Sequence, residues 1–278
     1  MKRRLSPIVL ALSCLAPLAC GRDFHLADFG VEPNSDSVQT AAIQRAVDEC
    51  SRQGGGRVVA PAGDFTTGTI VLKDNVELHL SEGARLIASA SYDDFPVFPP
   101  SEYRSQKDVG GWSALIFADG AENIAITGNG AIDGRGFGRK GRVSGKPGDS
   151  SGRPRNILFI SCRNVKVEGV SMFNAASWNQ HYLNCEDVVV SGISVSNHCN
   201  GNNDGIDIDG CRRFLLKDSV LDSDDDAIVL KSTGAAPCED VVVRNCVARS
   251  RANAIKCGTE SVGGFRRIRI EDCVVEPV

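Results

Sequence analysis

The sequence predicts an all-β protein, a right-handed parallel β-helix with a short capping helix at its N-terminal end. A short motif recurs about every 25 residues, most clearly in the second half of the chain. Each copy is followed by two further short strand-like segments. Three short strands per turn cannot bury an apolar face alone, whereas stacked turns share one continuous core. The 29 glycines and the aromatic content of 6% also favour a turn-rich β protein.

The repeated motif consists of a small or apolar residue, two polar residues and a short alternating strand. Its clearest copies begin at Cys162, Cys185, Cys211, Cys238 and Phe265, and weaker copies begin at Lys73 and Ala121. The third strand of each turn is expected at Gln180–Leu183, Gly205–Ile208, Ala227–Leu230 and Ala254–Cys257. The strands of one turn should therefore pair in parallel with the same strands of the next turn.

The cysteines follow the same repeat. Eleven cysteines in an exported chain would ordinarily favour disulfides. The four that open repeat units share one position, however, and Cys246 and Cys273 share a second. We therefore expect stacked interior thiols, with an occasional disulfide as the alternative. Because no Cys pair or Cys/His cluster has zinc-like spacing, we predict no metal site.

A segment before the repeats has helical spacing. From Ser37 to Ser51 the apolar residues are Val38, Ala42, Ile43, Ala46, Val47 and Cys50, and Gly54–Gly56 follow as a stop. We expect this helix to cap the open end of the β-helix, because an uncapped end exposes strand edges. At the other end the sequence finishes directly after a strand-like pair, and we expect further coils beyond Val278.

The N-terminus has the features of an export signal. Basic residues at Met1–Arg4 precede an apolar run from Pro7 to Ala19, which is too short to span a bilayer. We therefore divide the chain into a signal peptide, residues 1–20, and one catalytic β-helix domain, residues 21–278. The protein is expected in the periplasm, outside the cell or on the outer surface, with lipid attachment at Cys20 as an alternative to a soluble mature chain.

The net charge of −4 gives no whole-chain reason to expect a nucleic-acid partner. We expect a monomer without a membrane span. The segment from Gly134 to Arg155 carries seven basic residues and a single acid, Asp149. As a loop it would attract an acidic polysaccharide, although a solvated loop without a partner explains it equally well.

Carboxylates gather on the predicted third strands. In the register set by the cysteines, Asp204 faces Asp226 on the next coil, and Asn253 lies one coil further along. Since neighbouring strands lie roughly 4.8 Å apart, these side chains and Asp225 should crowd one patch of the wall. Like charges at that distance raise the pKa of some members. A protonated acid beside an ionised base is the pair that glycoside hydrolysis requires. Backbone-capping turns and a calcium site are the alternatives.

At these residues the chain resembles polygalacturonases, glycoside hydrolase family 28. Asn202-Asn-Asp204-Gly-Ile-Asp207 is similar to the family's Asn-Thr-Asp-Gly-x-Asp motif, and Asp224-Asp225-Asp226-Ala-Ile to its Gln/Gly-Asp-Asp-Cys-x motif. Further similar segments are Asp28-Phe-Gly-Val, Gly55–Gly63, Ile132–Gly136, Arg153-Pro-Arg and Ser177-Trp178. The resemblance covers almost all of the chain after the signal peptide.

The resemblance implies a mechanism for named residues. Asp225 matches the general acid, while Asp204 and Asp226 match the carboxylates that activate water in a single displacement with inversion. No cofactor is implied, and the substrate would be galacturonan or rhamnogalacturonan.

The chain departs from the family at two points. Asn253 stands where the family has a histidine, and the family's Arg-x-Lys clamp would fall beyond Val278. As substrate contacts we therefore consider Asp207, His181, Asn253 and Lys256. The alternative functions are a non-catalytic carbohydrate-binding β-helix and a calcium-dependent pectate lyase.

Overall fold

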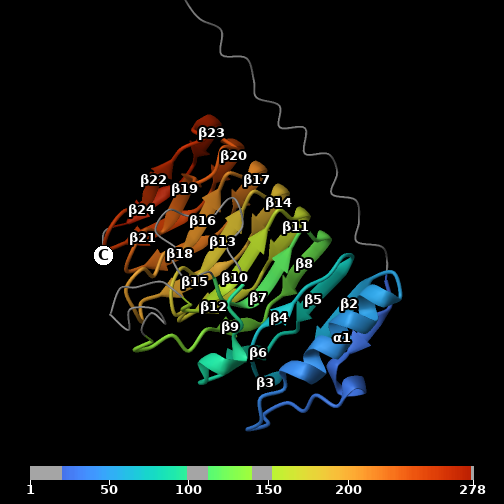
Figure 1. Ribbon diagram of the computed structural model, residues 1–278. Coiled ribbons are helices and arrows are strands. Elements are labelled where there is room, and N and C mark those ends of the chain that lie inside the picture. Colours follow the sequence, from blue (N-terminus) through green and yellow to red (C-terminus); the bar gives the residue numbers. More distant parts are fainter. Residues whose placement is uncertain (1–20, 99–111, 140–151, 277–278) are drawn as a thin grey trace, which may run out of the picture.

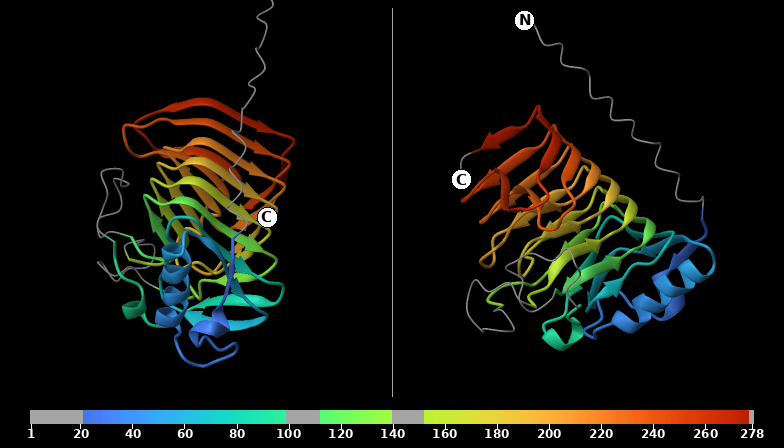
Figure 2. Two further views of the ribbon diagram at one scale, coloured as in Figure 1. Left: turned by 90° about the vertical axis from the view of Figure 1, so that its right-hand side faces the viewer. Right: turned by 45° about the horizontal axis from the view of Figure 1, so that its top comes forward.

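The structure is a computed structural model that describes residues 21–98, 112–139 and 152–276. Within these residues, three parallel sheets wind into a right-handed β-helix, which confirms the predicted fold class (Figure 1). Each full coil contributes one strand to each sheet in turn, and the coils stack along one axis from the N-terminal to the C-terminal end (Figure 2).

The strands divide among the sheets as follows. Sheet A holds β1 (Asp23–His25), β2 (Gly56–Ala60), β5 (Val76–Leu80), β8 (Glu122–Gly128), β11 (Arg163–Glu168), β14 (Glu186–Ser191), β17 (Arg212–Lys217), β20 (Cys238–Arg244) and β23 (Phe265–Glu271). Sheet B holds β3 (Gly63–Thr67), β6 (Ala84–Ala88), β9 (Ala131–Asp133), β12 (Ser171–Phe173), β15 (Ser194–Asn197), β18 (Val220–Ser223), β21 (Val247–Ser250) and β24 (Val274–Glu276). Sheet C holds β4 (Ile70–Val71), β7 (Ala114–Asp119), β10 (Arg155–Ile160), β13 (Gln180–Leu183), β16 (Ile206–Asp209), β19 (Ile228–Ser232) and β22 (Ile255–Ser261).

The two polar residues of the repeat make the turn into sheet A. The second of them has a positive φ in each copy of the repeat, from Asn75 (63°) to Arg267 (50°). Asparagine and aspartate tolerate this left-handed conformation better than most residues. The asparagines also link coils, because Asn123 donates to Asn75 at 2.8 Å and Asn164 donates to Asn123 at 2.7 Å. The polar part of the repeat therefore fixes the turn and the stacking register together.

The predicted cysteine stack is confirmed. Cys162, Cys185, Cys211 and Cys238 are all buried, and every cysteine in the described ranges is a free thiol. The Cys185 thiol donates to the carbonyl of Phe159 at 3.4 Å, and the Cys211 thiol to that of Tyr182 at 3.2 Å. Burial raises the pKa of Cys238 well above its usual value, so this thiol is inert toward oxidation.

The capping helix is also confirmed, with a later start. Helix α1 (Thr40–Arg52) covers the N-terminal end of the coils (Figure 2). It buries Ile43, Ala46, Val47 and Cys50. Val38 was wrongly placed in the helix: it precedes the helix and is 45% exposed. The helix begins at Thr40, whose hydroxyl accepts a hydrogen bond from the Gly68 amide at 2.6 Å. Two short 3-10 helices, η1 (Leu26–Phe29) and η2 (Tyr92–Asp94), complete the described elements.

No helix in the described ranges is long and apolar enough to cross a bilayer. The signal peptide predicted for residues 1–20, with Cys20, lies outside the described residues, and it stays a prediction.

The thiol stack yields a labelling prediction. In the native protein, iodoacetamide should modify the exposed Cys257 rapidly, whereas the four stacked cysteines should react only after unfolding in urea. Peptide mass spectrometry reads the modification at each cysteine. Rapid native labelling of Cys211, or a disulfide-linked peptide containing it, would contradict the stack.

Candidate functional site

The predicted column of polar residues lies where the strands of sheet C begin. The Gly205 amide donates to the carbonyl of Asp226 at 2.9 Å, and the Ala227 amide donates to the carbonyl of Asn253 at 2.9 Å. Ile206 pairs with Ile228, which in turn pairs with Ile255. Asp204, Asp226 and Asn253 therefore occupy equivalent positions on three successive coils, as the register predicted.

Three carboxylates converge at this column. One oxygen of each of Asp204, Asp225 and Asp226 lies within 4.8 Å of the other two. Asp204 is 4% exposed and Asp226 is 2% exposed, whereas Asp225 is only partly buried. The group is thus largely shielded from water, and Asp225 is its most accessible member.

Two donors from the next coil hold Asp226. The Asn253 side-chain amide donates to Oδ1 at 2.6 Å, and the Lys256 ammonium donates to Oδ2 at 2.6 Å. Each carboxylate oxygen thus has its own partner, and the ammonium balances its charge. Both Asn253 and Lys256, predicted as substrate contacts, therefore contact a predicted catalytic carboxylate.

Asp204 has a different environment from Asp226. Burial raises the pKa of its carboxyl well above the usual value, and the charges of Asp207 and Asp225 add to the shift. Burial therefore favours the protonated form of Asp204, whereas Asp226 is ion-paired with Lys256. Neighbouring carboxyl groups with such different environments provide the asymmetry that acid–base chemistry needs.

Asp225 is oriented through its backbone. Its carbonyl accepts hydrogen bonds from the hydroxyls of Ser223 at 2.8 Å and Ser250 at 2.5 Å. Its own carboxylate accepts from the Asp226 amide at 3.0 Å. These contacts come from two successive coils, so the loop between β18 and β19 is held on both sides.

The outer face of sheet C changes character along the stack. At β7 and β10 it is apolar, with Phe117, Leu158 and Ile160 packed around Trp112 together with Leu183 of β13. From β13 onward it is polar, since His181 pairs in register with Asp207, and Asp209 with Lys231. The carboxylate cluster lies in this polar part of the sheet.

The predicted contacts His181 and Asp207 lie deep in this face. Both are 0% exposed. His181 lies 3.2 Å from Asp209 and faces the rings of Trp112 and Trp178 edge-on. Among the described residues neither oxygen of Asp207 has a hydrogen-bond partner. Burial raises the pKa of Asp207 to about 8, against the opposing charges of Lys231 and Arg155. Their role as substrate contacts remains a prediction.

Four further residues of the site, Lys231, Glu260, Arg155 and Trp178, were not among the predicted site residues. Lys231 is 4% exposed, and its ammonium lies 3.3 Å from Glu260 and 3.9 Å from Asp207. The Arg155 guanidinium and the Lys231 ammonium lie 4.6 and 4.8 Å from the ring centroid of Trp178. An outward lysine on a strand usually indicates a solvated surface. The irregular pairing of β19 with β22, which brings Glu260 beside Lys231, has no clear signal in the sequence.

The prediction of a basic surface loop from Gly134 to Arg155 is wrong for three of its arginines. Arg139, Arg153 and Arg155 are buried. Arg153, for example, donates to the carbonyls of Ala176 and Gly201, both at 2.7 Å. These guanidinium groups satisfy backbone carbonyls and aromatic faces inside the protein, so they cannot attract a polymer from solution. The rest of the segment, residues 140–151, lies outside the described residues.

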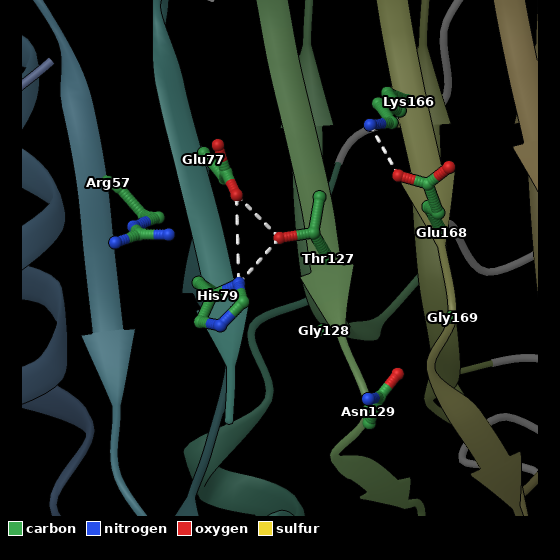
Figure 3. Close-up of a pocket in the computed structure, with 9 residues that line it drawn as sticks. All are labelled: Arg57, Glu77, His79, Thr127, Gly128, Asn129, Lys166, Glu168 and Gly169. Atoms are coloured by element: carbon green, nitrogen blue, oxygen red, sulfur yellow. Dashed lines mark hydrogen bonds and ion pairs between the residues drawn. The ribbon is translucent and has the colours of Figure 1, made fainter. Parts of the chain in front are cut away.

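A hollow in the surface lies on a different sheet from the carboxylate cluster. It has a volume of about 350 Å³ and opens on sheet A between β2, β5, β8 and β11 (Figure 3). Its charged groups are paired with neighbours. Thr127 donates to Glu77 at 2.5 Å and contacts His79 at 2.8 Å, while Lys166 forms an ion pair with Glu168. This hollow shares no residue with the carboxylate cluster, so we place the candidate site on sheet C.

The three clustered carboxylates are also the donor type that a hard cation prefers. Lys256 and Asn253 already engage both oxygens of Asp226, however, and this favours an acid–base group. The absence of a metal requirement stays a prediction, which chelation tests.

Comparisons with known proteins agree on one family. The model of glycosyl hydrolases family 28 matches residues 50–251. A probable polygalacturonase of Vitis vinifera is 31% identical over 95% of this chain and 56% of its own length. An exo-poly-alpha-D-galacturonosidase of Dickeya chrysanthemi is 24% identical over 73% of this chain and 41% of its own length. The chain thus spans about half of the length of these curated relatives.

Solved structures show the same similarity. A hyperthermoactive exopolygalacturonase from Thermotoga maritima is 28% identical with a TM-score of 0.79, covering 92% of this chain and 68% of that chain. A putative glycosyl hydrolase from Parabacteroides merdae is 29% identical with a TM-score of 0.63, covering 92% of this chain and 98% of that chain.

The buried Asp207 gives a stability prediction. A carboxyl group whose pKa is raised by folding binds more protons in the folded state. The free energy of unfolding therefore falls as the pH rises from the unfolded pKa, about 3.9, to the folded value of about 8. Asp207→Asn should remove this slope and stabilise the protein at pH 7 by at most about 4 kcal/mol. Urea unfolding between pH 4 and pH 8 measures it. An unchanged slope would show that Asp207 is ionised in the folded protein.

Proposed function

Because the chain belongs to family 28 of the glycosyl hydrolases, we propose that it hydrolyses glycosidic bonds in a pectin-like polysaccharide, galacturonan or rhamnogalacturonan. The observation that carries the proposal is the convergence of Asp204, Asp225 and Asp226, with one oxygen of each within 4.8 Å of the others. The relatives named as polygalacturonases support the substrate class. Hydrolysis of a glycoside needs one carboxyl group to protonate the leaving oxygen and another to activate water.

Each carboxyl group has an environment that suits one role. Asp225 is the most accessible, and it would donate its proton to the glycosidic oxygen. Asp226 is held by Asn253 and Lys256, and it would accept a proton from water. Burial favours the protonated form of Asp204, which would orient that water by a hydrogen bond. As the C–O bond breaks, the leaving oxygen gains the proton of Asp225, and the hydroxyl of water joins the anomeric carbon.

The stereochemical outcome is a separate part of the proposal. The resemblance to the family implies inversion of the anomeric centre. A separation of about 5 Å between carboxyl groups is more usual for retaining enzymes, and about 6.5 Å or more for inverting ones. The cluster is closer than the second value. We propose inversion, and the anomer of the first product, observed by proton NMR, decides between the two.

We further propose that the protein acts as an exported monomer. The basic and apolar residues from Met1 to Ala19 support export, and Cys20 offers a site for a lipid anchor. An extracellular position would give the enzyme access to pectin.

The central experiment is release of reducing ends from polygalacturonate and rhamnogalacturonan in the presence of a chelator. Asp225→Asn should lower kcat by about a thousandfold without weakening polymer binding, which affinity electrophoresis measures. Asp218→Asn, which changes an exposed aspartate on another face, is the matched control. Release that depends on calcium and yields unsaturated products would indicate a lyase. Binding without release by the wild type would favour a non-catalytic protein, a reading to which Asn253 lends some weight.

Substitution of Lys256 distinguishes two possible roles of this residue by the effect on kcat and KM. If its ammonium serves Asp226, as the 2.6 Å contact suggests, Lys256→Met should lower kcat about ten- to a hundredfold and leave KM nearly unchanged. If Lys256 instead binds a uronate carboxylate, KM should rise and kcat should persist. Lys256→Arg retains the charge and should recover part of the lost activity. A wild-type value of both constants in Lys256→Met would exclude either role.

A further inference from the structure

Lys231 has an unusual position for a lysine. It comes from β19, opposite Asp209 of β16, and its side chain is almost completely buried on the outer face of sheet C. Its ammonium lies 3.3 Å from Glu260 Oε2, 3.4 Å from the Gly258 carbonyl and 3.9 Å from Asp207 Oδ1. The ring of Trp178 lies 4.8 Å away. A lysine rarely gives up its hydration in this way unless neighbouring groups replace it.

The neighbouring groups favour a charged lysine. Burial opposes the charge, but Asp207, Glu260 and Asp204 together hold the pKa of Lys231 above its usual range. Lys231 therefore remains an ammonium at neutral pH. It is a fixed positive charge on a face that carries more buried carboxyl groups than buried cations.

Lys231 bridges two elements of the site. On one side it faces Asp207, three residues after Asp204 on the same coil. On the other side it holds Glu260 of β22, the strand that also carries Lys256. We propose that Lys231 is a positioning residue whose positive charge opposes the retention of protons by the buried carboxyl groups of Asp204 and Asp207. This inference rests on the proposed function for its effect on catalysis, but not for its effect on the carboxyl groups themselves.

The other charged groups on this face do not replace it. They are Arg155 of β10, His181 of β13, Asp207 and Asp209 of β16, Glu260 and Lys256 of β22, and Asp226. Arg155 stacks on Trp178 at 4.6 Å, one strand beyond His181. Lys256 contacts Asp226. Lys231 opposes the raised pKa of both Asp204 and Asp207, and for Asp207 it is the strongest charge that does so.

The test compares the pH profiles of kcat/KM for the wild type, Lys231→Met and Lys231→Arg. An opposite charge within about 4–6 Å lowers the pKa of a carboxyl group by about 1–3 units. Lys231→Met should therefore move the alkaline limb of the profile, where Asp204 would lose its proton, to higher pH by about one unit or more. Lys231→Arg, which keeps the charge, should return it toward the wild type. Lys217→Met removes a partly exposed lysine of sheet A and should leave the profile in place. Lower activity without a shifted profile in Lys231→Met would overturn the proposal.

A second measurement does not require activity. In Lys231→Met the pKa of Asp207 should rise further, so the fall in unfolding free energy with pH should extend above pH 8. This extension should vanish when Asp207→Asn is added, because the responding carboxyl group is gone. Identical pH dependence in Lys231→Met and the wild type would reject the role of Lys231. If the wild type has no hydrolytic activity and Lys231→Met still shows the extension, the proposed function is rejected and this inference is retained.

Discussion

The parallel stacking of coils is the constraint on which the rest of the structure depends. Once one strand of a coil pairs in register with the same strand of the next coil, every side chain has an equivalent neighbour about 4.8 Å away. Asp204, Asp226 and Asn253 lie together for that reason, although more than twenty residues separate each from the next along the chain. The buried cysteines follow the same register in the interior of the coils, and the asparagines with positive φ follow it at the turn before sheet A. The site is therefore a consequence of the period of the repeat.

The same stacking makes a buried charged face costly, and the neighbouring contacts reduce that cost. Removing a carboxylate from water disfavours its ionised form. Sheet C reduces this cost in two ways. Asp226 has an ammonium and an amide on its two oxygens, whereas burial favours the protonated form of Asp204. The apolar interior of the same coils, including Ile206, Ile208, Ile228 and Leu230, stabilises the strands that carry these groups. Burial of the apolar core therefore offsets the free-energy cost of the buried charged groups on sheet C.

The sequence was sufficient for the fold and the column, because both follow from periodicity. The repeat at Cys162, Cys185, Cys211 and Cys238 predicted the strands and the facing of Asp204 with Asp226, and the structure confirms these predictions. It was insufficient where the outcome depends on packing between segments without a shared period. The sequence predicted Arg153 and Arg155 as loop residues, because the neighbouring residues give no sign of the carbonyl groups and aromatic rings that these arginines contact. Lys231 was not predicted as a site residue, because Glu260 reaches it only through an irregularity in the pairing of β19 with β22.

Those missed residues determine the chemistry that the column can perform. A row of aspartates at one spacing has no preference for which member holds a proton, and the spacing alone cannot separate acid from base. The asymmetry comes from the cations on either side, with Lys256 on Asp226 and Lys231 beside Asp207. Replacement of the family histidine by Asn253 removes one donor that can carry charge, whereas Lys256, three residues later, brings an ammonium to the same carboxylate. The repeat thus supplies the positions of the carboxyl groups, and the irregular contacts supply the difference between them.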